Sequence, residues 1–234
     1  MTNTERAMRR NSSIGTIFAL LIGMVGHVCT AQAASETFPS PEAASHALYQ
    51  AVRDNNEQAL IRLLGAGNEF VSGDDPMQER REREHFAGKY QQMHRLVRAS
   101  GGSTILYVGA ENWPFPFPLV QESGAWHFDA KAGMEEVRAR RVGENELAAI
   151  AASRALVSQN HDDRPAPLYG YYFRRLPGQQ TVVAYPAEYG VTGVMTFLAG
   201  PDDLVFEKDF GPNTAEAAKT IERPDSLSTW HRVE

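Results

Sequence analysis

Carboxylates beside aromatic residues are the side chains of this sequence best suited to chemistry. Glu188 lies between Tyr185 and Tyr189 in a segment that we expect to connect two strands. Loops held by a rigid sheet often carry function, so Glu188 is the first candidate catalytic carboxylate, and both tyrosines are candidate ligand-binding residues. Asp129 is the second candidate, because acid–base catalysis by two carboxylates leaves no short motif. An ordered turn held by tyrosine packing explains the same segment without chemistry.

A second candidate surface is the run Trp-Pro-Phe-Pro-Phe-Pro at residues 113–118. Alternating prolines fix an extended path and remove backbone donors. Trp113 and Phe115 could therefore form an aromatic ledge that stacks a ligand, a glycan or a peptide. The alternative is a stiff segment whose rings fill the core, and we favour it because buried aromatic rings stabilise cores strongly.

Histidine, cysteine and serine patterns indicate neither a metal site nor a nucleophile. We expect His85 and His94 on one helix, where nine residues, or about 900°, place them on opposite faces. No His pair four residues apart, Gly-x-Ser-x-Gly elbow, phosphate-binding loop or dinucleotide fingerprint occurs. We therefore predict no metal and no cofactor.

Residues 79–84 are all charged, with both signs present, and could be mistaken for a catalytic cluster. Glu79 and Arg83 are four residues apart in the order that stabilises a helix. A solvated helix face explains the run without an active site.

The first 33 residues have the three parts of a cleavable export signal. Arg6, Arg9 and Arg10 precede an apolar stretch at residues 14–28, and Ala31-Gln32-Ala33 offers a cleavage site. The stretch is short for a membrane span, which needs roughly 20 apolar residues. A lipid anchor on Cys29 is a further alternative, but Gly26-His27-Val28 before it does not fit that signal. We therefore expect cleavage after Ala33 and export to the periplasm or cell envelope.

Cleavage would remove the single cysteine and a net charge of +2, changing the formal charge from −6 to −8. A chain without thiols forms no disulfides, so burial must stabilise it. An acidic protein is poorly suited to nucleic acid or an anionic membrane surface. We expect neither partner after cleavage, and the sequence does not indicate the oligomeric state.

Helical patterns dominate the first half of the chain. Ser40 and Pro41 begin a helix as N-cap and first residue. A second helix spans residues 57–64, and a third has residues 77–98 as its body. Strands are expected at residues 104–108 and 125–128, the latter after a hairpin turn at residues 122–124.

The second half begins with helical patterns at 130–141 and again after Gly143. Four antiparallel strands follow at residues 170–174, 181–185, 192–198 and 204–208, and then a short helix at 214–221. This order predicts an α+β fold in which N-terminal helices with a small antiparallel sheet precede a helix and a second antiparallel sheet. We predict two subdomains, residues 34–142 and 143–234.

Several strings occur in a familiar order. They are Phe38-Pro39-Ser40-Pro41-Glu42, Asn112-Trp113-Pro114-Phe115-Pro116, Gly143-Glu144-Asn145-Glu146-Leu147, Tyr169-Gly170-Tyr171-Tyr172-Phe173, Tyr185-Pro186-Ala187-Glu188-Tyr189-Gly190 and Lys208-Asp209-Phe210-Gly211-Pro212. Together they resemble the bacterial exported-protein family catalogued as domain of unknown function 2950. The resemblance implies no activity. It implies a longer segment before the Gly-Tyr-Tyr-Phe strand than the one around residues 157–168 here.

Each half also resembles a known fold at a coarser level. Residues 41–129 look like the cone-shaped nuclear-transport-factor-2-like fold, and residues 144–210 are similar to type IV pilin heads. Such analogies imply no function.

We expect a periplasmic or cell-envelope protein that binds an envelope ligand or a protein partner rather than transforming it. The alternatives are a carboxylate-dependent hydrolase or carbohydrate-active enzyme, and a structural subunit of an envelope assembly.

Overall fold

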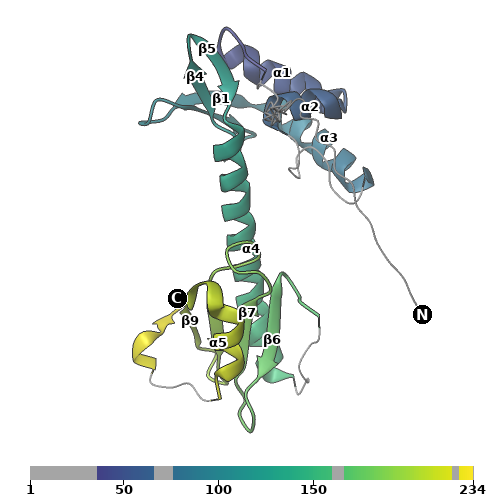
Figure 1. Cartoon of the computed structure of the whole chain (residues 1–234). Helices are drawn as coiled ribbons and strands as arrows, with labels where there is room; N and C mark the ends of the chain where they lie inside the picture. Colours follow the sequence, from purple (N-terminus) through teal and green to yellow (C-terminus); the bar gives the residue numbers. More distant parts are fainter. Residues whose placement is uncertain (1–35, 66–75, 160–165, 223–226, 234) are drawn as a thin grey trace, which may run out of the picture. The chain divides into compact units, whose positions relative to one another are not determined.

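The computed structural model describes residues 36–65, 76–159, 166–222 and 227–233 and confirms the α+β class (Figure 1). The expected export signal lies outside these residues, as do residues 160–165 of the short connection before the Gly-Tyr-Tyr-Phe strand. The elements of the first half are α1 (Pro41–Arg53), α2 (Glu57–Leu64), α3 (Pro76–Gln92), β1 (His94–Arg98), β2 (Thr104–Val108), β3 (Trp113–Pro114), β4 (Leu119–Glu122) and β5 (Ala125–Phe128).

The second half begins with a long helix and continues as strands. Its elements are α4 (Ala130–Ser158), β6 (Tyr171–Arg175), β7 (Val182–Pro186), β8 (Thr196–Ala199), β9 (Val205–Lys208), η1 (Gly211–Asn213), α5 (Thr214–Thr220), η2 (Leu227–Thr229) and β10 (His231–Arg232). The five strands β1 to β5 form sheet A, with the path β1-β2-β4-β5 and β3 paired to β2. Sheet B has the order β10-β9-β8-β7-β6.

Local sequence determines where the first two helices begin. The Ser40 hydroxyl accepts from the Ala43 amide at 3.2 Å, and Pro41 follows it as predicted. Asn56 caps α2 in the same way, accepting from the Ala59 amide at 3.0 Å. These side chains satisfy amide donors that a helix start otherwise leaves without a partner.

The prediction for the third helix was wrong at its C-terminal end. It stops at Gln92, and His94–Arg98 is a strand that pairs antiparallel with β2 from His94↔Val108 to Arg98↔Thr104. A turn at Gly101 and Gly102 reverses the chain, with the Gly102 amide donating to Ala99 O at 3.0 Å. Pairing with β2 supplies interactions that local helix propensity cannot anticipate.

The hairpin between β4 and β5 confirms the predicted turn. Ser123 and Gly124 both have positive φ, 51° and 85°, and Glu122 pairs with Ala125 across them. Two such residues form the turn whose twist matches paired strands. The hairpin places Phe128 in the core of the first half, which also contains Phe115, Phe117, Leu48 and Leu60.

Helix α4 is continuous from Ala130 to Ser158, although we expected an interruption near Gly143. A single glycine inside a helix costs only about 1 kcal/mol and need not end it. Val137 belongs to the core of the first half, and Ala149, Ile150 and Leu156 belong to a core of the second half. The division at residues 142/143 thus falls inside α4, and the two-subdomain assignment stays a prediction. Among the described helices, α4 included, none combines the length and apolarity needed to cross a bilayer.

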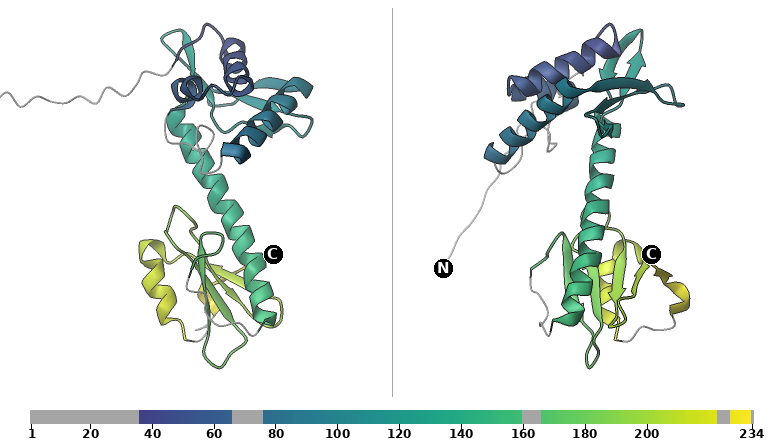
Figure 2. Two further views of the ribbon diagram at one scale, coloured as in Figure 1. Left: turned by 90° about the vertical axis from the view of Figure 1, so that its right-hand side faces the viewer. Right: turned by 180° about the vertical axis from the view of Figure 1, so that it is seen from behind.

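Sheet B is covered by a helix on each face (Figure 2). Residues of α4 pack with Tyr171, Phe173 and Phe197 on one face. Ala218 of α5 packs with Val183 and Leu198 on the other. Because neighbouring strand residues point to opposite faces, the sheet contributes to two separate cores.

Candidate functional site

A depression on the surface of the first half lies between α3 and sheet A. It has a volume of about 640 Å³ and is lined by Glu82, His85, Phe86, Lys89, Val108, Glu111 and Trp113. We call it the α3 groove. Its volume lies within the range of roughly 300 to 1,000 Å³ that is common for small-molecule sites.

Two parts of the chain bring these side chains together. Residues 82, 85, 86 and 89 recur at helical spacing, so one face of α3 supplies them. The opposite wall comes from the end of β2, the following turn and β3, where Val108 pairs with Trp113. The groove therefore depends on the packing of α3 against sheet A.

An ion pair joins the two walls of the groove. The Lys89 ammonium donates to the Glu111 carboxylate, and this interaction holds the pKa of Glu111 below its usual value. Gly109 leaves room for the pair: a Cβ there would lie 2.7 Å from Glu111 Oε2 and 3.1 Å from Lys89 Cδ. Its φ of 75° also favours glycine.

Trp113, a predicted ligand-binding residue, forms part of the groove and is 39% exposed. The Arg140 guanidinium lies over its ring, with Cζ 5.4 Å from the ring centroid. Arg140 is itself held by Glu136 at 2.8 Å and by Pro114 O at 2.9 Å. These contacts fix the indole in place, as a ligand platform requires.

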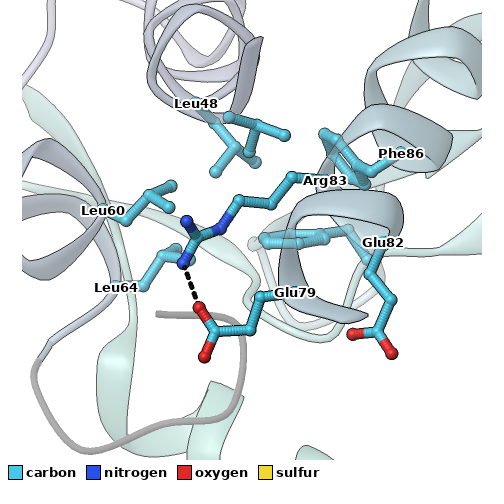
Figure 3. A pocket seen from close by; sticks show the side chains of 9 residues that line it. Leu48, Leu60, Leu64, Glu79, Glu82, Arg83 and Phe86 are labelled. Atoms are coloured by element: carbon cyan, nitrogen blue, oxygen red, sulfur yellow. Dashed lines mark hydrogen bonds and ion pairs between the residues drawn. The ribbon is translucent and has the colours of Figure 1, made fainter. Parts of the chain in front are cut away.

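A smaller cavity of about 60 Å³ shares the lining residues Glu82 and Phe86 with the α3 groove (Figure 3). Arg83 extends into it among leucine side chains and donates to Glu79 at 3.1 Å. Their side chains are only 12% and 18% exposed. The expectation of a wholly solvated charged face was therefore wrong for this pair, although Glu84 of the same run is exposed.

Phe115, the second residue of the predicted ledge, is 2% exposed. Its ring contacts Phe86, Phe117 and Phe128, with centroids 5.6 to 6.0 Å apart. It also lines the small cavity with Arg83. The Pro-rich run thus places Trp113 at the groove and Phe115 in the core.

The predicted residues of the second half lie at one end of sheet B. Tyr185 lies near the end of β7 and packs beside Tyr172, with ring centroids 5.6 Å apart. Tyr189 donates to Asp209 at 3.2 Å. Glu188 is exposed, and its backbone forms a closed turn with Thr192. The Thr192 amide and hydroxyl donate to Glu188 O at 2.9 and 3.2 Å, and the Glu188 amide donates to Thr192 Oγ1 at 3.0 Å.

Asp129 is the N-cap of α4, where its carboxylate accepts from the Ala132 amide at 3.0 Å. It follows β5 of sheet A, whereas Glu188 follows β7 of sheet B. The structure thus assigns the two predicted catalytic carboxylates to different sheets. Their catalytic role stays a prediction.

His94 lies on β1 rather than on α3. Its ring stacks on Tyr90, with centroids 3.9 Å apart, and its Nδ1 is 2.9 Å from Tyr90 O. The prediction that His85 and His94 lie on one helix was therefore wrong. No group of three or more His, Cys, Asp or Glu side chains among the described residues could hold a metal ion.

Sequence reasoning missed the role of Lys89, Glu111 and His85 in the groove. Lys89 and Glu111 are separated by 22 residues and belong to different elements. The helical spacing of residues 82, 85 and 89 was visible, but it shows only a shared face.

A family model matches this chain, whereas no individual protein in the comparisons does. No curated protein and no solved structure matches it, so neither the nuclear-transport-factor-2-like nor the pilin-head similarity has a structural neighbour. A family model described as "Protein of unknown function (DUF2950)" matches residues 35–164 and 156–233. The two stretches overlap at residues 156–164, where we expected the shortened connection. The chain therefore belongs to the DUF2950 family.

Proposed function

We propose that this chain is an exported protein of the bacterial cell envelope and binds a ligand in the α3 groove without transforming it. The groove itself is the observation that supports this most strongly. Phe86 and Val108 give it an apolar lining, and Trp113 offers a fixed, partly exposed indole. Pockets of this kind combine apolar surface with a few placed polar groups.

The charges of the groove suit binding better than proton transfer. Glu111 pairs with Lys89, which lowers its pKa, so the carboxylate stays ionised and is a poor proton donor. A carboxylate-dependent hydrolase is the second candidate because Glu82 gives the groove another carboxylate.

Ligand binding can be tested with a panel of soluble envelope fragments, namely peptidoglycan muropeptides, oligosaccharides and short peptides. We expect at least one to shift the indole resonance of Trp113 in nuclear magnetic resonance spectra and to bind Trp113→Ala more weakly. Tyr169→Ala is the matched control, because Tyr169 is an exposed aromatic residue that does not line the groove. Equal binding to Trp113→Ala and the wild type would argue against this site. Turnover of a fragment would favour the hydrolase.

Export can be tested separately by expressing the full chain in a bacterium and sequencing the N-terminus of the exported product. We expect it to begin at Ala34. A product that retains residues 1–33, or that carries lipid on Cys29, would contradict cleavage at this site.

A further inference from the structure

The α3 groove is lined by acidic and aromatic side chains. Two of its seven lining residues, Glu82 and Glu111, are carboxylates, and Lys89 is the only lysine or arginine among the seven. Lys89 is already paired with Glu111, and its side chain is 30% exposed. The fixed charges of the lining therefore sum to a net negative value.

The indole of Trp113 adds a second feature that attracts cations. The face of an aromatic ring carries negative charge density, and tryptophan binds cations best among the aromatic residues. The ring already accepts one cation, since the Arg140 guanidinium lies over it at 5.4 Å. Part of the side chain is still exposed at the groove.

Phe86 and Val108 line the same groove with apolar surface. Both belong to or pack against the core of the first half, so their positions are held from behind. Val108 is only 3% exposed, so a ligand with an apolar body would gain free energy mainly by removing the surface of Phe86 and of its own body from water.

From these features, and on the basis of the proposed binding function, we propose that the α3 groove recognises a small organic cation: an amino or guanidinium group attached to an apolar body. The cation is attracted by Glu82 and the indole of Trp113, and the apolar body contacts Phe86 and Val108. The formal charge of −6 for the whole chain favours the approach of such a ligand.

Three probes that each carry a phenyl group on a short chain test this inference: phenethylamine, 2-phenylethanol and phenylacetate, which are cationic, neutral and anionic at pH 7. Each is titrated into the purified protein while the indole resonances are recorded. A cation–π contact and an exposed ion pair together predict about five-fold tighter binding of phenethylamine than of 2-phenylethanol. Phenylacetate should bind most weakly.

Glu82→Gln should weaken phenethylamine binding by about three-fold and leave 2-phenylethanol binding unchanged. Glu84→Gln is the matched control, since Glu84 is exposed on the same helix and does not line the groove. If phenylacetate or 2-phenylethanol binds at Trp113 as tightly as phenethylamine, the cation preference is wrong although the groove still binds. If no probe shifts the Trp113 resonance, the cation preference is overturned, whereas the proposed binding function is decided by the panel of envelope fragments.

Discussion

Arg174 and Arg175 are neighbours on β6, yet each guanidinium binds the C-terminal end of a different helix. Arg174 Nη2 donates to Ala218 O of α5 and to O of its C-cap residue Ile221, both at 2.7 Å. Arg175 Nη2 donates to Leu156 O at the end of α4 at 2.7 Å, and also to Gln159 O. Because neighbouring strand residues point to opposite faces, one dipeptide attaches both covering helices to sheet B.

Replacing Arg174 with methionine should remove two of these hydrogen bonds while keeping a long apolar side chain. Hydrogen bonds to charged groups contribute about 1.5 to 3 kcal/mol, so we expect the free energy of unfolding in urea to fall by about 2 kcal/mol. Arg154→Met is the control, since Arg154 makes a partly exposed ion pair with Asp203 at 3.4 Å. Its effect should stay within about 0.5 kcal/mol. Equal effects of both substitutions would show that Arg174 does not hold α5.

Glu146 should stabilise the loop between β7 and β8 as strongly as Arg174 stabilises the packing of α5. Its Oε1 accepts from the amides of Val194 and Met195 at 2.9 and 3.0 Å. Glu146→Ala leaves both donors without this partner, and we expect a loss of about 2 kcal/mol in chemical denaturation. Glu146→Gln, which keeps an acceptor oxygen, should lose less. Glu144→Ala is the control, because Glu144 is exposed and lies two residues earlier on α4, and it should change the free energy of unfolding little. A comparable loss in Glu144→Ala would contradict the role of Glu146.

The pH dependence of stability should reveal the buried hydroxyl of Tyr171. Burial, and then the negative charge of Glu146, raises its pKa above the ordinary value of about 10. Above that pH the unfolded chain loses a proton that the folded chain keeps, so stability that is fully present below pH 10 is lost as the pH rises. We expect a slope of about 1.4 kcal/mol per pH unit from this group.

Tyr171→Phe should remove that part of the slope, as measured by urea unfolding between pH 9 and 11. Burial also raises the pKa of Tyr90, which contributes to the slope in both proteins, so the difference between them is the informative quantity. Tyr169→Phe, at a position 56% exposed, is the control. An unchanged slope in Tyr171→Phe would mean that this hydroxyl titrates normally.

Sequence patterns predicted those parts of the fold that short segments determine. Ser40 begins the first helix, and Ser123 with Gly124 forms a hairpin turn, because each interaction spans only a few residues. The strand His94–Arg98 was missed because it depends on pairing with β2. The inward direction of Arg83 was missed for a similar reason, since only the packing of α3 on α1 and α2 shows which charges are covered.

The candidate site was only partly predictable. Trp113 stood out because a tryptophan in a Pro-rich run is unusual, but its partners come from α3 and from the turn after β2. Lys89 and Glu111 are ordinary surface residue types, and only their proximity across the groove gives them a role. Glu188 was chosen for its place between two tyrosines in a strand connection and Asp129 for its residue type, and the structure assigns them to different sheets.

Gly109 should be sensitive to substitution because it makes room for the Lys89–Glu111 pair. Gly109→Ala adds a Cβ that would lie 2.7 Å from the Glu111 carboxylate, at a φ of 75°. Gly102→Ala is a matched control, since its φ is 88° and no atom lies within 4 Å of the added Cβ. Both should lose about 1 kcal/mol from the left-handed backbone, but only Gly109→Ala should also shift the Trp113 indole resonance. Identical spectra for the two variants would contradict the crowding.

The ligand-binding role of the α3 groove is tested most directly by crystals of the protein soaked with a fragment library that contains amines, alcohols and carboxylates on similar apolar bodies. We predict electron density for bound fragments in the groove, in contact with Trp113 and Phe86 and enriched in amines. Fragments that bind only elsewhere, while the groove contains solvent alone, would contradict the proposed function.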